Sequence, residues 1–184
     1  MQSEIFIQSL TLQTNEILRR VEPLFAEDLH SLTWKANENT WSILECIEHL
    51  NLYGDFYLPL IQNKIKNSDT KSAPEFNSGL LGGYFTKSIL PKNKMKKMKT
   101  FKDKNPLNAS LDKATIERFI NQQTLLIELL SQSKKVNLNK IKIPTSISNL
   151  IKLKLGDVFQ FYINHILRHL AQIEKIQNET KKPD

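Results

Sequence analysis

The segment FYINHILRHLAQIEKI, residues 161–176, carries the pattern from which both the fold and a site can be inferred. Its apolar residues recur every three to four positions, which predicts an amphipathic helix. His165 and His169 are four residues apart and therefore lie one turn apart on one face of that helix. Two imidazoles so placed can bind one metal ion, as in the helical motif of metalloproteases. The glutamate of that motif is absent because Ile166 follows His165, so the pair indicates a metal without indicating a protease.

Three further segments show the same helical spacing, so the sequence predicts an all-α protein built as a four-helix bundle. Glycine is scarce, with five in the chain, which favours long helices over many short strands. Pro23 is expected to kink the first helix or to end it early. The expected helices span residues 3–28, 42–66, 110–133 and 156–177.

The second helix has a recognisable start. Ser42 and Glu45 form the S-x-x-E pattern of a capping box, in which each side chain binds a backbone amide of the other residue. Trp41 precedes this box and can pack as a hydrophobic staple. His49 lies about two turns into the helix, on the face that it shares with Tyr53. A histidine on an inward face is often a hydrogen-bonded core residue rather than a ligand, and both interpretations stay open for His49 taken alone.

The connection between the second and third helices, residues 67–110, is long for a compact domain and is either functional or mobile. Its apolar centre with glycines, residues 79–85, is expected to form a short helix or to pack over the domain. Residues 136–143 alternate like a strand, but no partner strand is evident, so we expect an extended loop. Residues 1–179 are expected to form a single domain, followed by a polar tail at residues 180–184.

The formal net charge of +7 raises the question of nucleic-acid binding. Residues 92–104 hold seven lysines and one aspartate, a local net charge of +6, so the rest of the chain contributes only +1. Arginine is rare, and Phe101 is the one aromatic residue among these lysines, so we expect a solvated loop. The alternative is a non-specific site for polyanions or acidic ligands.

Composition also bears on the compartment. Cys46 is the only cysteine, which excludes an intramolecular disulfide and fits a reducing compartment. No apolar run approaches the ~18 residues of a membrane span, and the first residues lack the pattern of a signal peptide. The sequence therefore predicts a cytoplasmic protein with no membrane partner.

Three of the four histidines can meet if the second and fourth helices are neighbours. His49 would then join His165 and His169. Three imidazole nitrogens suit a borderline divalent ion such as Zn or Ni and leave positions open for water or substrate. His30, the fourth histidine, lies in a connection and is not expected to take part.

The two segments that carry these histidines resemble those of one known family. Residues 41–50, WSILECIEHL, resemble the W-S-x-x-E-x-x-x-H-L segment of the DinB-like superfamily, and residues 165–173, HILRHLAQI, resemble its closing H-x-x-R-H-x-x-Q-I segment. The resemblance implies a four-helix bundle in which three histidines hold a divalent metal, often nickel or zinc and sometimes iron. Carried over to this chain, the ligands are His49, His165 and His169.

The same resemblance implies an activity only in outline. Several relatives are S-transferases or isomerases that use a low-molecular-weight thiol, others are described as metal-dependent hydrolases, and many are dimers. This chain is therefore expected to be a metal-dependent enzyme for a small-molecule substrate, with its catalytic residues unassigned, and to form a homodimer. The alternative is a non-catalytic metal-binding or stress-response bundle. In the enzyme, the lysines of residues 92–104 are candidates for binding the carboxylates of an acidic thiol.

Other residues on these helices are weaker candidates for a functional role. Arg168 and Gln172 face sideways from the histidine pair and could serve an interface, the metal ligands or neither. Asp157 opens the last helix and is expected to stabilise its N-terminus electrostatically. Cys46 lies one turn before His49 and is expected to be a small core residue.

Overall fold

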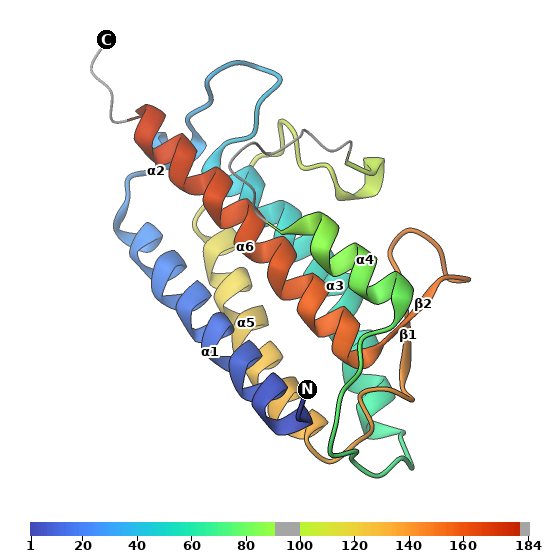
Figure 1. The fold of residues 1–184 in the computed structure, drawn as a ribbon. Helices are drawn as coiled ribbons and strands as arrows, with labels where there is room; N and C mark the ends of the chain where they lie inside the picture. Colours follow the sequence, from blue (N-terminus) through green and yellow to red (C-terminus); the bar gives the residue numbers. More distant parts are fainter. Residues whose placement is uncertain (91–99, 181–184) are drawn as a thin grey trace.

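Four long helices lie side by side and make up most of the structure (Figure 1), which confirms the prediction of a mostly helical chain. The computed structural model describes residues 1–90 and 100–180 of the chain. No helix in these two ranges has the length and apolarity needed to cross a membrane. The long helices are α1 (Ser3–Val21), α3 (Ile43–Lys66), α5 (Ala114–Ser133) and α6 (Leu155–Thr180). The shorter elements are η1 (Glu22–Ala26), α2 (Leu29–Thr33), α4 (Leu80–Ile89), η2 (Lys102–Lys104), β1 (Lys142–Pro144) and β2 (Lys152–Lys154).

Each long helix turns an apolar side toward the others. Helix α3 packs against α5 and α6, and α1 packs against the same two helices. Leu10 of α1, Leu50 of α3, Phe119 of α5 and Ile166 of α6 are all fully buried in one continuous hydrophobic core. Because α3 and α6 are neighbours, polar residues on their facing sides can meet inside the protein.

The predicted capping box fixes the start of α3. Ser42 Oγ accepts a hydrogen bond from the Glu45 amide at 3.2 Å, and Glu45 Oε2 accepts one from the Ser42 amide at 2.8 Å. The other carboxylate oxygen, Glu45 Oε1, accepts from the Lys35 ammonium at 2.7 Å and from the Asn108 amide at 2.6 Å. Glu45 therefore ties α3 both to the chain before it and to the segment that follows η2.

The observed boundaries refine several expectations. Pro23 lies in η1, so the expected early end of the first helix is confirmed. Helix α5 begins at Ala114, later than expected. The connection between α3 and α5 contains α4, so the short helix expected around residues 79–85 is present. Of the expected polar tail, Thr180 is the last residue of α6, and residues 181–184 lie outside the described residues.

The expectation of an unpaired extended loop at residues 136–143 is wrong at its C-terminal end. Strand β1 begins at Lys142 and pairs antiparallel with β2, which places Ile143 opposite Leu153. These two side chains are buried, so they form a cross-strand pair that stabilises the hairpin. The partner strand is hidden in the sequence because β2 is only three residues long and runs directly into α6.

Helix α4 lies along α6 (Figure 1), and Asp157 of α6 binds the residues at the start of α4. The buried Asp157 carboxylate accepts hydrogen bonds from the Ser78 hydroxyl at 2.5 Å and from the Gly79 amide at 3.0 Å. Gly79 is the residue that precedes α4, so Asp157 caps the start of α4 as well as lying in the first turn of α6. A Cβ atom at Gly82 would lie 2.2 Å from the Asp157 carboxyl group, so this close approach requires glycine.

Candidate metal centre

His49 lies in the second turn of α3 and is held by a backbone group. Its Nδ1 atom lies 2.6 Å from the carbonyl oxygen of Lys104. Because a carbonyl can only accept a hydrogen bond, Nδ1 carries the proton and Nε2 keeps its lone pair. The Lys104 carbonyl therefore selects the tautomer in which His49 can bind a metal through Nε2.

His165 and His169 lie one turn apart on the side of α6 that faces α3. His169 Nδ1 lies 3.1 Å from Oε1 of Gln172, which accepts a hydrogen bond from the Nδ1–H group, so His169 Nε2 also keeps a lone pair. Gln172 thus supports a histidine, one of the roles that the sequence left open. His165 Nδ1 is buried and has no hydrogen-bond partner among the described residues.

The three Nε2 atoms converge at one buried point between α3 and α6. His165 Nε2 lies 3.2 Å from that of His49 and 3.1 Å from that of His169. Two nitrogens that bind one zinc tetrahedrally at about 2.05 Å lie about 3.3 Å apart, close to these separations. The structure therefore brings together the three histidines expected to meet. Their role as metal ligands stays a prediction.

The hydrogen-bonding capacity of this histidine cluster fits a metal ion. The Nε2 atoms of His49 and His169 are both acceptors, for the reasons given above. His165 could donate one N–H to only one of them, which leaves the other acceptor buried without a donor. A cation would bind all three lone pairs at once, and three imidazole nitrogens are a donor set that suits zinc or nickel.

Burial keeps the histidine cluster neutral. Loss of solvation lowers the pKa of His49 to about 4, although the hydrogen bond to Lys104 opposes this shift. Burial also lowers the pKa of His169 to about 3. For His165, burial and then the two neighbouring imidazoles lower the pKa well below its ordinary value. Neutral imidazole is the form that binds a metal, so no proton has to leave the cluster near neutral pH.

Aromatic side chains cover the cluster. The ring of Trp41 lies 4.7 Å from that of His49 and 5.8 Å from that of His169, measured between centroids. The ring of Tyr53 lies 4.6 Å from that of His165. Burial raises the pKa of Tyr53 to about 12, so its hydroxyl stays protonated. Trp41, expected only as a staple, therefore also forms a wall of the site.

The segment of residues 104–108 supports the site in a way that the sequence did not indicate. Besides the Lys104 carbonyl, Asn105 Oδ1 accepts a hydrogen bond from the Trp41 indole at 3.2 Å. The Asn108 amide binds the carboxylate that caps α3. Asn108 has a φ of 64°, in the left-handed region that asparagine enters more readily than most residues. This segment thus fixes both a histidine and an aromatic wall.

Lys104 is less exposed than the solvated loop predicted for residues 92–104 would make it. Its side chain is only 14% exposed, and its ammonium lies 5.8 Å from the centre of the Phe56 ring. The expectation of a solvated loop is therefore wrong for this residue. For residues 92–99 the expectation cannot be compared, because they lie outside the described residues.

Two other residues considered from the sequence lie outside the cluster. Cys46 is fully buried in the hydrophobic core, which confirms its interpretation as a core residue. Burial, together with the charge of Glu45, raises the pKa of the Cys46 thiol far above neutrality, so it is not a thiolate nucleophile. His30 is exposed in α2 and does not join the other three histidines.

Gln172→Ala is expected to weaken metal binding by about tenfold or more, because partners that orient a ligating histidine typically contribute that much. The variant removes the acceptor that holds the His169 tautomer. Competition with a chromophoric chelator measures the affinity. Gln177→Ala, on the next turn of α6, is the matched control and should bind metal as the unchanged protein does. Equal affinities in all three proteins would show that Gln172 does not orient His169.

Comparison with models of protein families finds a match over most of the chain. The model of the DinB superfamily matches residues 9–173 of this chain. The matched region runs from α1 into α6 and includes all three histidines of the cluster. No curated protein and no solved structure matches the chain.

Proposed function

The chain belongs to the DinB superfamily, and on this premise we propose that it is a divalent-metal-dependent enzyme with His49, His165 and His169 as metal ligands. The observation that carries the proposal is the convergence of three Nε2 atoms at one buried point. In two of the three, a fixed hydrogen bond at Nδ1 leaves the Nε2 lone pair available. A hydrogen-bonded core histidine would not need this arrangement.

Nickel or zinc is the metal that this donor set favours, and iron(II) is a further candidate. Neutral imidazole is a borderline ligand that suits all three ions, whereas magnesium and calcium prefer oxygen ligands. Three protein ligands leave coordination positions for a water or a substrate, as in catalytic zinc sites.

A divalent ion at this point would supply Lewis acidity and lower the pKa of a bound water or thiol. The chain itself supplies positioning: the Lys104 carbonyl and Gln172 orient two of the imidazoles, and Trp41 and Tyr53 limit the access of water to them. The Tyr53 hydroxyl and the Cys46 thiol both stay protonated near neutral pH, because burial raises their pKa values, so neither can act as a general base. We therefore propose an S-transfer from a low-molecular-weight thiol, or a hydrolysis, in which no strong protein base is needed.

We place this site in a single domain, residues 1–179, in which the four long helices form the four-helix bundle of the family. The helix neighbours and the one continuous core support this arrangement. We further propose a homodimer in the cytoplasm, as expected from the resemblance and from the single cysteine, Cys46, which is not in a disulfide.

The alternative is a non-catalytic metal-binding bundle, for example in a stress response. The observation that favours it is burial, because the three histidines are only 3%, 5% and 8% exposed. A metal enclosed in this way could serve as a structural element rather than as a catalyst. The two functions differ in whether the metal accepts a ligand from solution.

Cobalt(II) substitution tests this difference, because its absorption spectrum reports the ligands that it has. We expect a small thiol to add a sulfur-to-cobalt charge-transfer band to the spectrum of the cobalt-loaded protein. The His169→Ala variant is the control and should show neither bound cobalt nor the band. A cobalt spectrum that no thiol and no other small ligand alters would contradict the enzyme and support the non-catalytic alternative.

A further inference from the structure

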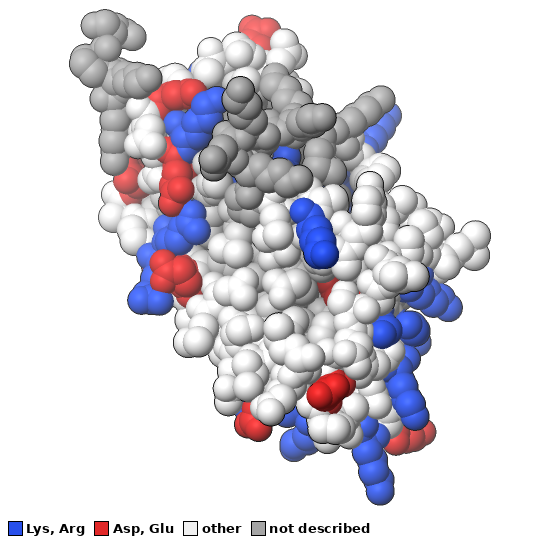
Figure 2. Space-filling view, in the orientation of Figure 1, with Lys and Arg blue, Asp and Glu red and all other residues white. Residues whose placement is uncertain are grey.

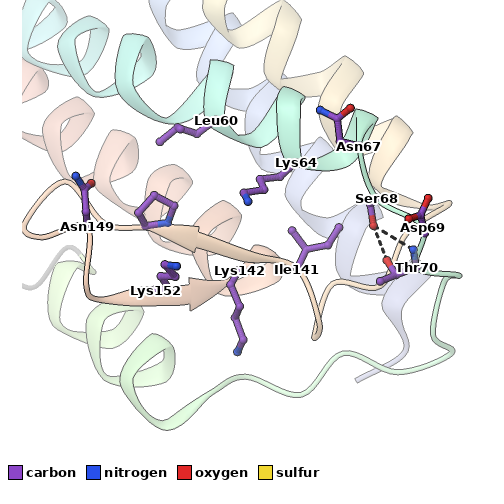
Figure 3. A pocket seen from close by; sticks show the side chains of 11 residues that line it. Leu60, Lys64, Asn67, Ser68, Asp69, Thr70, Ile141, Lys142, Asn149 and Lys152 are labelled. Atoms are coloured by element: carbon purple, nitrogen blue, oxygen red, sulfur yellow. Dashed lines mark hydrogen bonds between the residues drawn. The ribbon is translucent and has the colours of Figure 1, made fainter.

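A cavity, which we call the lysine cavity, lies between the C-terminal end of α3 and the β1–β2 hairpin (Figure 3). Its volume is about 640 Å³, and Lys64, Lys142 and Lys152 line it. Figure 3 shows Lys64 reaching from α3 toward the strands that carry the other two lysines. Lys64 follows His49 by roughly 22 Å along the axis of α3, so this cavity is separate from the metal centre.

The positive charge of the cavity exceeds its negative charge, with three lysines and one aspartate among the described residues that line it. Among the described residues, none of the three lysines forms an ion pair with a carboxylate. Within the described part of the chain, Asp69 is the one acidic residue that lines the cavity. Residues 134–154 contain six lysines and no acidic residue, and Figure 2 shows basic side chains gathered on the side of the molecule that carries the hairpin. The cavity is therefore a place of concentrated positive charge.

The hairpin holds its lysines on this side for a structural reason. Ile143 and Leu153 point into the core, so the alternation of side chains along each strand places Lys142 and Lys152 on the opposite face. Lys154, the cross-strand partner of Lys142, donates to the Asn77 carbonyl at 2.6 Å. Like charges on one face of a hairpin repel each other. A bound anion would remove this repulsion.

The remaining lining gives the lysine cavity two kinds of wall. Ser68 and Thr70 contribute hydroxyl groups, which are hydrogen-bonded to each other at 2.7 Å. Leu60, Ile141 and Pro144 contribute apolar surface. A bare inorganic anion would leave the apolar wall without a contact, whereas an organic anion could use both walls.

We propose that the lysine cavity binds a phosphorylated small molecule of about the size of a nucleotide. The ammonium groups of Lys64 and Lys152 contact the phosphates, because lysine binds phosphate as a mobile point charge. Lys142, which points away from Lys64 in Figure 3, adds positive charge at the edge of the cavity. The apolar wall packs against the organic part of the ligand. The described residues that line the cavity include no arginine and no aromatic residue, so they provide no stacking platform of the kind found in single-stranded nucleic-acid sites.

Calorimetry with ADP, pyrophosphate and adenosine tests the proposal on the full chain. We expect one site for ADP, weaker binding of pyrophosphate and no binding of adenosine. Lys64→Gln and Lys152→Gln should each weaken ADP binding by about tenfold, the usual size of one hydrogen bond to a charged group. Both lysines are exposed, so the variants should fold normally, as circular dichroism would verify.

Lys175→Gln is the matched control, because Lys175 is an exposed lysine on α6 away from the cavity, and its ADP affinity should not change. Three results would overturn the proposal. One is the absence of ADP binding at low ionic strength. Another is an equal loss of affinity in Lys175→Gln, which would indicate a non-specific charge effect. The third is binding that His169→Ala abolishes and the two cavity variants leave intact, which would place ADP at the metal centre.

Discussion

Replacing His165 by alanine is expected to abolish the stabilisation that zinc or nickel gives to the folded protein. A metal present at a thousandfold excess over its dissociation constant stabilises the folded state by about 4 kcal/mol. We expect this difference in the free energy of unfolding for the unchanged protein and almost none for His165→Ala. Elemental analysis should show a corresponding loss of bound metal.

His165 is the most informative of the three histidines because its Nε2 atom lies next to both of the others. Removing it leaves one imidazole on each helix instead of a continuous set of three. The affinity should therefore fall by more than the roughly 10–100-fold that accompanies loss of an outer partner such as Gln172. The buried His165 Nδ1 atom has no partner among the described residues, so its removal sacrifices no hydrogen bond at that position.

Chemical denaturation of untagged protein, with and without added metal, measures the effect. His30→Ala is the matched control, because His30 is exposed and lies outside the cluster. Its metal-dependent stabilisation should equal that of the unchanged protein. If His165→Ala gained as much stability from the metal as His30→Ala did, the cluster would not be the binding site.

Sequence reasoning located the histidines well because their spacing is tied to helix geometry. The i, i+4 pair on α6 needs only the helical repeat, and the start of α3 follows from Ser42 and Glu45. Once two long helices are expected to be neighbours, His49 can meet the pair. These inferences depend on local patterns, which a sequence displays directly.

The parts of the site that the sequence did not reveal depend on backbone groups and on distant pairing. Any residue at position 104 would have the same backbone carbonyl, so the residue type there does not predict the contact with His49. Strand β2 is too short for its alternation to be recognised. Lys142 and Lys152 come to line one cavity with Lys64 only when the hairpin packs beside α3.

Acid is expected to destabilise the metal-free protein strongly, because its three buried histidines resist protonation. Burial lowers the pKa of His49 to about 4 and that of His169 to about 3, and it lowers the pKa of His165 well below its ordinary value. In the unfolded chain each histidine titrates near pH 6.5. Below that pH the unfolded state therefore binds more protons than the folded state, and stability falls as the pH falls.

The expected loss in the free energy of unfolding follows from the proton affinity of the histidines in the unfolded chain. At about pH 5.5, one histidine that titrates at about 6.5 when unfolded and stays neutral when folded costs about 1.4 kcal/mol. Three such residues give a loss of about 4 kcal/mol between about pH 8 and about pH 5.5. The loss should level off only near the lowered pKa values of the folded state.

Urea denaturation at a series of pH values, in the presence of a chelator, measures this dependence. His169→Gln should reduce the slope of stability against pH by about one third, because one of three equivalent contributions is removed. His30→Gln changes an exposed residue and should leave the contributions of all three buried histidines to the slope unchanged. Carboxylates titrate mostly below this range, so they contribute little to the slope. A stability that did not change between about pH 8 and about pH 5.5 would mean that the folded protein takes up protons as readily as the unfolded chain, which is incompatible with a dry, neutral cluster of three imidazoles.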